Sequence, residues 1–419
     1  MSTTTPSETV RNSVPVIVSG VGTEEPEYQL TEPLDPDLAG VFRNLPADDR
    51  AYRDRARSFV QDEVLPVIDG HWDRAEYPLT LARRIGQLDL MRDGISVDGF
   101  APMSPLAAGL VQAEISRGDG SIGTIIGVQG ALALRSIALL GSAEQKAEWL
   151  APLARGEKLG AFALTEPTHG SDSVSLETRA ASVSGGYAIT GHKKWIGNGS
   201  VGDVAVTWAR GDDNRVHGYL VPQDAPGYTA TTITGKGSLR AIWQAHIEYN
   251  GVRVPESALL PGAQSFQDTS RVLQATRLGV AWASLGHATA CYETAVHYTS
   301  QRIQFGRPLA ASQIVQERLA RMLSELTGLQ TLLMQLTGLD AAGELGGTQA
   351  AMGKYTATRA ARSIAANARD LLGGNGILLE NRVIRHFADV ESLHTYEGTE
   401  TVQALLLGRE ITGISAFTG

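Results

Sequence analysis

Residues 161–172, Ala-Phe-Ala-Leu-Thr-Glu-Pro-Thr-His-Gly-Ser-Asp, mark the point at which the hydrophobic pattern of this chain changes. From Pro46 up to this stretch, apolar residues recur at helical spacing. Beyond it they alternate with polar residues, and Gly185-Gly186 supplies a tight hairpin turn. Helical spacing returns near Ser265 and continues toward the C-terminus. The pattern predicts an α+β fold in which a compact antiparallel β lobe lies between two α-helical lobes.

The changes in pattern divide the chain into four segments. Residues 1–37 are a polar N-terminal arm, residues 38–158 an α-helical domain, residues 159–264 a β domain and residues 265–419 a second α-helical domain. A length of 419 residues agrees with roughly three folded units at about 150 residues each. Four helices are expected in the last domain, at residues 268–304, 313–336, 348–372 and 400–411.

The composition narrows the classes of function. The formal net charge is -9, from 36 Lys+Arg against 45 Asp+Glu, so there is no basic excess to bind a nucleic acid backbone. Cys291 is the single cysteine, which excludes a disulfide framework, an iron–sulfur cluster and a cysteine-ligated zinc site. No uninterrupted apolar stretch is long enough to cross a bilayer, and the Ser/Thr-rich N-terminus lacks the apolar core of a secretory signal. We therefore expect a cytoplasmic protein that binds no nucleic acid, membrane or metal.

Two stretches next to predicted strands could hold a ligand. In residues 161–172 the strand breaks at a proline into a turn, where Thr165 and Ser171 offer hydroxyl groups. An ordinary strand end with a polar cap has the same local pattern. In residues 193–199, Trp195 beside a glycine-rich turn could stack on an aromatic cofactor, or it could be a core tryptophan.

Three further sites, in the C-terminal domain, likewise allow two interpretations each. Arg302 could hold a pyrophosphate, or it could complement the dipole at the C-terminus of the preceding helix. The glycines within residues 373–376 could expose backbone N–H groups to a ligand, or they could end a helix. Glu397 could cap the helix that follows it, or it could be a base whose pKa is raised in apolar surroundings. The residues themselves do not decide between these alternatives.

The order of these stretches resembles the acyl-CoA dehydrogenase/oxidase superfamily. The order is Thr-Glu-Pro with Gly-Ser-Asp (165–172), Trp-Ile-Gly-Asn (195–198), Arg with Phe-Gly (302–306), Gly-Gly-Asn-Gly (373–376) and Tyr-Glu-Gly-Thr (396–399). Residues 369–377 and 408–414 resemble the glutaryl-CoA dehydrogenase-like branch, and residues 195–198 and 265–270 resemble the plant short-chain acyl-CoA oxidase-like branch. The resemblance implies a three-lobe fold: an N-terminal all-α lobe, a middle antiparallel β-barrel or sandwich and a C-terminal α-helical bundle.

The resemblance also implies an FAD cofactor, held between the β domain and the C-terminal domain. The flavin side would be contacted by Phe162, Leu164, Thr165, Ser171, Trp195, Ile196, Gly197, Thr399, Thr401 and Phe417. The ADP half of a neighbouring subunit's FAD would be reached by Arg302, Phe305, Gln313, Asp370, Leu371, Gly373 and Gly374. Sites shared in this way imply a homotetramer built as a dimer of dimers.

By the same resemblance, Glu397 is the catalytic base and an acyl-CoA is the substrate. Glu397 would take the α-proton while the β-hydrogen leaves as hydride to flavin N5. Some relatives carry the base on the long helix of the C-terminal domain, but the matching position here is Thr276. Electron-transferring flavoprotein would be the oxidant. The acyl-CoA would be contacted by Ser171, Gly123, Thr124, Gln274, Arg277 and Gly398.

Two departures from the family pattern bear on the activity. Glutaryl-specific relatives place an arginine where this chain has Gly123 and a glutamate where it has Ser116. A distal carboxylate would then lack its cation, so we expect a short or branched neutral acyl chain. Gly197 stands where dehydrogenases usually carry threonine, and it is expected to open space beside the flavin. A short-chain acyl-CoA oxidase that reduces O2 to H2O2 is therefore an alternative, as are a glutaryl-CoA dehydrogenase and an acyl-carrier-protein-linked dehydrogenase.

Overall fold

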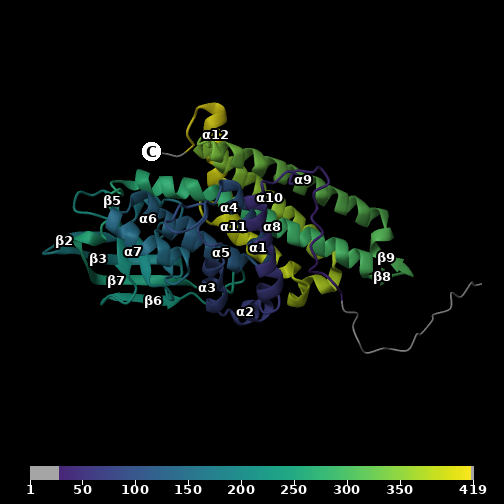
Figure 1. Ribbon diagram of the computed structural model, residues 1–419, viewed down its shortest axis with the longest axis horizontal. Coiled ribbons are helices and arrows are strands. Elements are labelled where there is room, and N and C mark those ends of the chain that lie inside the picture. The colour runs from purple at the N-terminus through teal and green to yellow at the C-terminus, as the bar shows by residue number, and fades with distance from the viewer. Residues whose placement is uncertain (1–27, 417–419) are drawn as a thin grey trace, which may run out of the picture.

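The computed structural model describes residues 28–416. Along the chain, a group of helices is followed by a curled sheet and then by a bundle of long helices. In Figure 1 the sheet lies at one end of the molecule, and the small hairpin of β8 (Ile303–Gln304) and β9 (Arg307–Pro308) lies at the other. The predicted α+β fold, with helical lobes before and after a β lobe, is confirmed.

Polar side chains start several of the N-terminal helices. The Ser104 hydroxyl caps α4, and Ser142 opens α7 through a capping box with Gln145. Asp119 is fully buried between α4 and α5 and accepts a hydrogen bond from Ser121 N at 2.7 Å. The helices are α1 (Ala47–Phe59), α2 (Ile68–Arg74), α3 (Leu79–Gln87), α4 (Pro105–Gly118), α5 (Gly120–Ile126), α6 (Arg135–Leu140) and α7 (Ala143–Ala154), with π-helical turns at Val60–Val64 and Gly127–Leu134.

One helical run within residues 28–416 is long and apolar enough to cross a membrane, namely residues 120–140. This run contains Gln129 and Arg135, so it is not an uninterrupted apolar stretch. More than half of this run, 61% of its apolar window, is buried inside the structure. A core helix meets the same criterion of length and composition, and the burial of this run marks it as part of the core.

Strands β1 to β7 form one curled sheet with the order β1-β4-β2-β3-β7-β6, in which β5 pairs with β4, and β8 and β9 pair separately. The predicted hairpin is present, with Val183 opposite Gly186. The expectation of purely antiparallel pairing is wrong, because β4 runs parallel to both β1 and β2. The chain reverses once between β2 and β3 and again before β4, so β4 runs in the direction of β2. The strands are β1 (Gly160–Ala163), β2 (Arg179–Val183), β3 (Gly186–Gly197), β4 (Val204–Arg210), β5 (Val216–Pro222), β6 (Tyr228–Thr232) and β7 (Gln244–Pro255).

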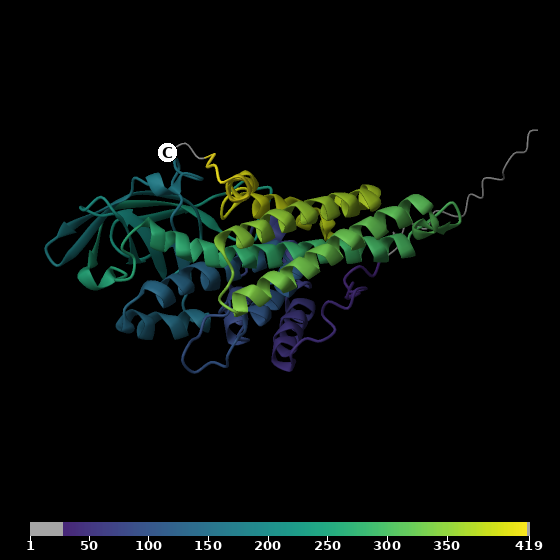
Figure 2. The same ribbon diagram turned by 90° about the horizontal axis from the view of Figure 1, so that it is seen from above.

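The C-terminal bundle contains the four expected helices and one that was not predicted. Figure 2 shows its long helices running side by side away from the sheet. The unpredicted helix, α11, precedes the Tyr-Glu-Gly-Thr stretch. The helices are α8 (Phe266–Gln301), α9 (Gln313–Ala341), α10 (Gly347–Leu371), α11 (Val383–Thr395) and α12 (Glu400–Thr412).

Helix α11 contacts both other lobes of the molecule through its buried charged residues. Its Arg385 pairs with Asp119 at 2.5 Å and with Asp69 of α2 at 2.7 Å. Asp389, one turn further on, accepts a hydrogen bond at 2.6 Å from Leu239 N, in the loop between β6 and β7. Burial, together with the nearby charge of Asp119, raises the pKa of Asp389 to about 8. The end of α11, and hence the start of the Glu397 stretch, is held by contacts with both other lobes.

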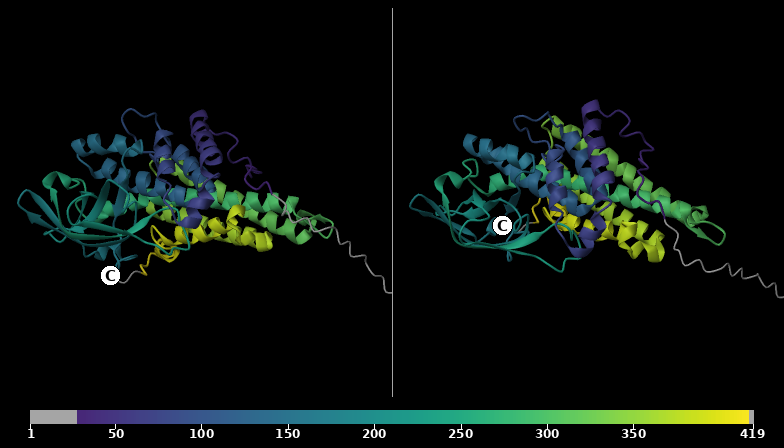
Figure 3. Two further views of the ribbon diagram at one scale, coloured as in Figure 1. Left: turned by 90° about the horizontal axis from the view of Figure 1, so that it is seen from below. Right: turned by 60° about the horizontal axis from the view of Figure 1, so that its bottom comes forward.

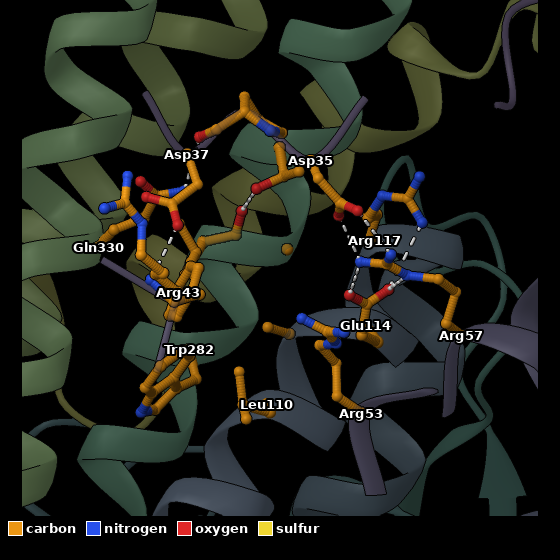
Figure 4. Close-up of a pocket in the computed structure, with 16 residues that line it drawn as sticks. Asp35, Asp37, Arg43, Arg53, Arg57, Leu110, Glu114, Arg117, Trp282 and Gln330 are labelled. Atoms are coloured by element: carbon orange, nitrogen blue, oxygen red, sulfur yellow. Dashed lines mark hydrogen bonds and ion pairs between the residues drawn. The ribbon is translucent and has the colours of Figure 1, made fainter. Parts of the chain in front are cut away.

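The segment of residues 28–45 is fastened to the helices by an ion pair and by hydrogen bonds. Arg57 of α1 pairs with Asp35 of this segment at 2.6 Å and with Glu114 of α4 at 2.7 Å, and Arg117 lies behind them (Figure 4). These groups line a cavity of about 170 Å³. Because Arg57 and Arg117 are both paired with carboxylates, Arg117 with Glu114 and Glu293, we interpret the cluster as a structural network that holds the segment in place.

Gly286 of α8 is required where α8 packs closely against α4. A Cβ atom there would lie 2.2 Å from the carbonyl oxygen of Ala113, so we expect Gly286→Ala to destabilise the fold by about 2 kcal/mol. Gly328→Ala on α9 is the matched control: no atom lies within 4 Å of its Cβ, and loss of a helical glycine should stabilise by about 0.5–1 kcal/mol. Urea unfolding measures both, and equal midpoints for the two variants would contradict the expectation.

Candidate active site

Glu397 lies in the short connection between α11 and α12. Its backbone is left-handed, with φ 52°, and that of Gly398 is left-handed too, with φ 85°. The cap of α12 is Thr399, whose hydroxyl accepts a hydrogen bond from Val402 N at 3.2 Å. The capping role considered for Glu397 therefore belongs to Thr399, and the Glu397 carboxylate faces other groups.

The half-buried Glu397 carboxylate accepts a hydrogen bond from Thr276 of α8, at 2.5 Å between Oγ1 and Oε2. Burial raises the pKa of Glu397 above its usual value, against the lowering effects of the Thr276 hydrogen bond and of the charges of Lys354 and Arg277. A carboxylate with a raised pKa that stays ionised beside cations is suited to removing a proton near neutral pH.

Arg277 lies beside Thr276 on α8, close to Glu397. Its Nη1 is 3.5 Å from the carbonyl oxygen of Gly347, and its buried Nε has no hydrogen-bond partner among the described residues. Burial lowers the pKa of Arg277, while the charge of Glu397 opposes this. The predicted substrate residue Gln274 is exposed one turn away and lies against Gly347. Arg277 thus offers an unused donor next to the carboxylate.

Trp195 lies at an irregularity of β3 that turns its ring outward. Its backbone has φ 65°, the pairing of β3 with β7 shifts register between Lys193 and Ile196, and the residue is 52% exposed. Thr165 follows β1, and its backbone carbonyl accepts a hydrogen bond from Lys194 N at 2.8 Å. Thr165 therefore lies directly beside this bulge. A large exposed aromatic ring in a strained backbone is not a core residue, and it suits a flat ligand.

Other residues predicted on the flavin side are placed differently. Phe162, Leu164 and Ile196 are at most 8% exposed, and the Phe162 ring packs on Trp208 at 5.8 Å between centroids. These three side chains are part of the hydrophobic core and lie beneath the surface that carries Trp195. Ser171 and Thr401 are exposed, and Phe417 lies outside the described residues.

The loop that carries Thr165 and Ser171 is anchored by a buried ion pair. Glu166 pairs with Lys193 of β3 at 2.9 Å, and both side chains are at most 4% exposed. Glu166 also accepts hydrogen bonds from Thr178 N at 2.9 Å and from the Thr178 hydroxyl at 2.6 Å. With its oxygens satisfied in this way, Glu166 serves the fold and holds the loop against the sheet.

The residues predicted to reach the ADP half of the cofactor gather at the far end of the bundle. Arg302 ends α8 and donates to the Tyr28 hydroxyl at 3.0 Å, and Phe305 is fully exposed at the tip of the β8–β9 hairpin. Asp370 pairs with Arg318 of α9 at 2.7 Å, which joins the ends of two helices there. Gln313 begins α9, Leu371 ends α10, and Gly373 and Gly374 follow with open space around them.

This far group is not brought to Glu397 within one chain. Thr276, which bonds Glu397, and Arg302 lie on the same helix, and a rise of about 1.5 Å per residue separates them by about 39 Å. Figure 3 shows the sheet at one end of the molecule and the tip of the green helices at the other. One dinucleotide cannot span that distance, so the two groups of one chain cannot hold the same molecule.

Gly197 does not open space, contrary to expectation. A Cβ atom at this position would lie 2.6 Å from Cγ2 of Val128, in the π-helical turn after α5. The volume that a side chain at residue 197 would need is therefore filled by Val128. Gly197 therefore does not provide the space that was expected for oxygen beside the flavin.

Gly123 and Thr124, predicted to contact the acyl group, lie on α5. A hydrogen bond from Thr124 lowers the pKa of Tyr396, although burial raises it overall. A Cβ atom at Gly123 would lie 2.2 Å from the Ser116 hydroxyl, and Gln112 Nε2 donates at 3.1 Å to Gly123 O and to Ser116 Oγ. Neutral hydrogen-bonded groups thus fill the place from which an arginine would extend.

Sequence reasoning missed two polar residues at the site, Lys354 of α10 and Gln403 of α12. Both are buried, and both donate to carbonyl groups around Glu397. Lys354 left a readable signal, because it is the only lysine of α10 and lies on the stripe of small buried residues that includes Ala350 and Ala357. Gln403 left none.

The contact between residues 128 and 197 can be tested by a double-mutant cycle. We expect Gly197→Thr alone to destabilise the protein by about 1–3 kcal/mol, because the new side chain overlaps Val128. Val128→Ala should remove that overlap, so that the double variant recovers about 1 kcal/mol or more. Thermal and urea unfolding of the four proteins measure the coupling, and simple additivity would contradict the contact.

Comparison with known proteins agrees with this arrangement. Models of the N-terminal, middle and C-terminal domains of acyl-CoA dehydrogenase match residues 46–157, 161–252 and 266–412. The mitochondrial short-chain specific acyl-CoA dehydrogenase of Bos taurus is 32% identical over 370 residues, which cover 87% of this chain and 90% of that protein. A crystal structure of glutaryl-CoA dehydrogenase from Mycobacterium smegmatis matches with a TM-score of 0.89 and 42% identity, covering 91% of this chain and 98% of that one.

A second structure, of a glutaryl-CoA dehydrogenase from Mycobacterium smegmatis in complex with FADH2, matches with a TM-score of 0.89 and 38% identity, over 91% and 98% of the two chains. The matches extend through all three lobes and include the Glu397 stretch. The chain therefore belongs to the acyl-CoA dehydrogenase family, whose members are FAD-dependent oxidoreductases acting on the CH–CH group of acyl-CoA.

Proposed function

We propose that this enzyme converts a short or branched neutral acyl-CoA to the 2-enoyl-CoA, with Glu397 as the base. The observation that carries the proposal is the Glu397 carboxylate itself, half-buried, bonded to Thr276 and close to the charges of Arg277 and Lys354. Within residues 28–416, no helix cap or ion pair accounts for a carboxylate in that position.

The proposed role of Glu397 is to remove the α-proton of the thioester. Thr276 orients the carboxylate through its hydrogen bond, and the unused Nε of Arg277 is available to an oxygen of the acyl-CoA. The backbone N–H of Glu397 is the proposed donor to the thioester oxygen as negative charge develops there. FAD, when bound, supplies the acceptor for the hydride that leaves the β-carbon.

The residues present fit a flavin. Trp195 offers an exposed ring on β3, and Thr165, which follows β1, carries a hydroxyl and lies next to the bulge through its backbone carbonyl. At the other end of the bundle, Gly373 and Gly374 leave their surroundings open to a ligand. We propose that Trp195 and Thr165 hold the flavin ring, and that the glycines approach the ADP half.

The separation of these two groups supports an oligomer in which a second copy completes each site. In the arrangement we propose, a homotetramer, the far end of one bundle lies against the flavin site of its neighbour. Arg302 and Gln313 would then act on the partner's cofactor. Val128, which fills the space beside Gly197, favours a dehydrogenase that passes electrons to electron-transferring flavoprotein over an oxidase.

The surroundings of Gly123 support a neutral acyl end. Ser116 and Gln112 supply hydrogen bonds there but no positive charge, so a distal carboxylate would be desolvated without a counter-ion. The similarity to glutaryl-CoA dehydrogenases in the rest of the chain does not alter this local chemistry.

Glu397→Gln tests the base directly. We expect the variant to keep its visible flavin absorption and to lose turnover of butyryl-CoA by at least ~10²-fold, because the amide cannot accept the α-proton. In the wild type, kcat/KM should fall as the pH drops through the raised pKa of Glu397, since only the ionised carboxylate is a base. A variant with full activity would contradict the assignment.

The acyl end is tested with substrates of equal length. We expect pentanoyl-CoA to be turned over at least ~10²-fold more efficiently than glutaryl-CoA, which corresponds to about 3 kcal/mol for an unpaired buried carboxylate. Flavin bleaching and enoyl-CoA formation give the two values of kcat/KM. Efficient release of CO2 from glutaryl-CoA would overturn the proposed specificity.

A further inference from the structure

The connection that carries Glu397 is held by side chains that bind its backbone carbonyls. The ammonium group of Lys354 donates to the carbonyls of Tyr396 and Gly398. The amide of Gln403 donates to the carbonyls of Glu397 at 3.2 Å and of Gly398 at 3.1 Å. Three consecutive peptide groups around the base are thus fixed by two buried donors, one on α10 and one on α12.

The backbone here needs such restraint. Glu397 and Gly398 are consecutive left-handed residues, and a side chain of the size of glutamate disfavours that conformation. A strained backbone persists only where its surroundings determine it. A Cβ atom at Gly398 would lie 2.5 Å from Gln403 Nε2, so the close approach of Gln403 also explains the glycine.

Lys354 is buried in a way that stability alone does not explain. It is 1% exposed, and the partners of its ammonium group within residues 28–416 are backbone carbonyls, with no carboxylate within ion-pair distance. Burial lowers the pKa of Lys354 to about 8, and the nearby charge of Arg277 contributes to this, whereas the charge of Glu397 favours the ammonium form. A lysine kept in such a place, among small apolar residues, needs the carbonyls and the Glu397 charge as its partners.

We propose that Lys354 and Gln403 are positioning residues for the base: together they hold the connection that aims the Glu397 carboxylate, and Lys354 additionally supplies the positive charge that keeps it ionised. This inference rests on the proposed role of Glu397. Two roles are proposed: both residues fix the geometry of the connection, and Lys354 alone also acts through its charge.

The other charged and polar groups around Glu397 set the direction of the expected pH effect. From α8, the Thr276 hydrogen bond and Arg277 favour the ionised carboxylate, as Lys354 does from α10. From the loop before α4, Asp93, which pairs with Arg135 of α6 at 2.7 Å, disfavours it. From α11 and α12, the connection presents the Tyr396 phenol, whose pKa burial raises, His394, whose pKa burial lowers, and Glu400, which pairs with Arg359. Removing the charge of Lys354 leaves Asp93 opposed by fewer cations, so the pKa of Glu397 should rise further.

The test compares Lys354→Met with Gln403→Leu in the flavin-loaded oligomer, using butyryl-CoA and an artificial electron acceptor. Both variants should lower kcat by on the order of 10²-fold, the loss that a misplacement of about 1 Å causes, with a smaller change in KM. Only Lys354→Met should also displace the acid limb of kcat/KM to higher pH. Lys354→Arg, which keeps the charge, should return that limb to its original place while kcat stays reduced.

Arg359→Met is the matched control, since it removes a positive charge and an exposed α10–α12 ion pair from the same helix. It should leave the acid limb in place. An unchanged kcat in both test variants would overturn the positioning role, and an unmoved acid limb in Lys354→Met would overturn the electrostatic role. If Lys354→Met does not yield flavin-loaded protein, Lys354→Gln, which keeps a donor without the charge, takes its place. Glu397→Gln in the same assay separates the failures, because full activity there would refute the base itself.

Discussion

The buried ion pair between Arg385 and Asp119 is the constraint on which the site depends. Both side chains are almost fully buried and lie 2.5 Å apart, and they join α11 to the junction of α4 and α5. The Asp119 carboxylate also caps α5 by accepting a hydrogen bond from Ser121 N, so the same group binds α11 and fixes the start of α5. A charge pair this deeply buried tolerates little displacement, because the fully buried Asp119 would lose its cation. The position of α11 relative to the N-terminal lobe is therefore closely defined.

The position of α11 in turn determines where Glu397 lies. Helix α11 ends at Thr395, two residues before Glu397, and Asp389 ties its middle to the β lobe through Leu239. Helix α8 comes to the same point from the other side and presents Thr276. Parts of the chain that are far apart in sequence thus meet at the carboxylate, and each is held by its own buried polar contact.

The sequence was sufficient for the order of lobes, most helices and the identity of the candidate base. It was not sufficient for α11, because Arg385 and Asp389 occupy positions where a helical pattern would require apolar residues. Their burial makes sense only once the partners from other lobes are known. Parallel pairing of β4 with β1 and β2 was missed for a similar reason, since alternation of side chains is the same in parallel and antiparallel strands.

The individual site residues show the same limit. The local pattern around Trp195 suited a core tryptophan as well as a ligand-binding one, and only its exposure and left-handed backbone distinguish them. Thr276 was recognised as the position of an absent alternative base, but its hydrogen bond to Glu397 depends on the crossing of α8 with the connection before α12. Contacts between distant segments carry this information, and a single sequence does not record them.

The contact between Val128 and Gly197 has a consequence for the history of the family. A strand and a helical turn share one small volume here, and the side chain of one fills what the other leaves empty. Neither position is then free to vary alone: a larger residue at 197 requires a smaller one at 128. In related chains, a large residue at one of these positions should therefore accompany a small residue at the other. If the two positions changed one at a time, the intermediate chain had either a cavity or a steric overlap beside the sheet.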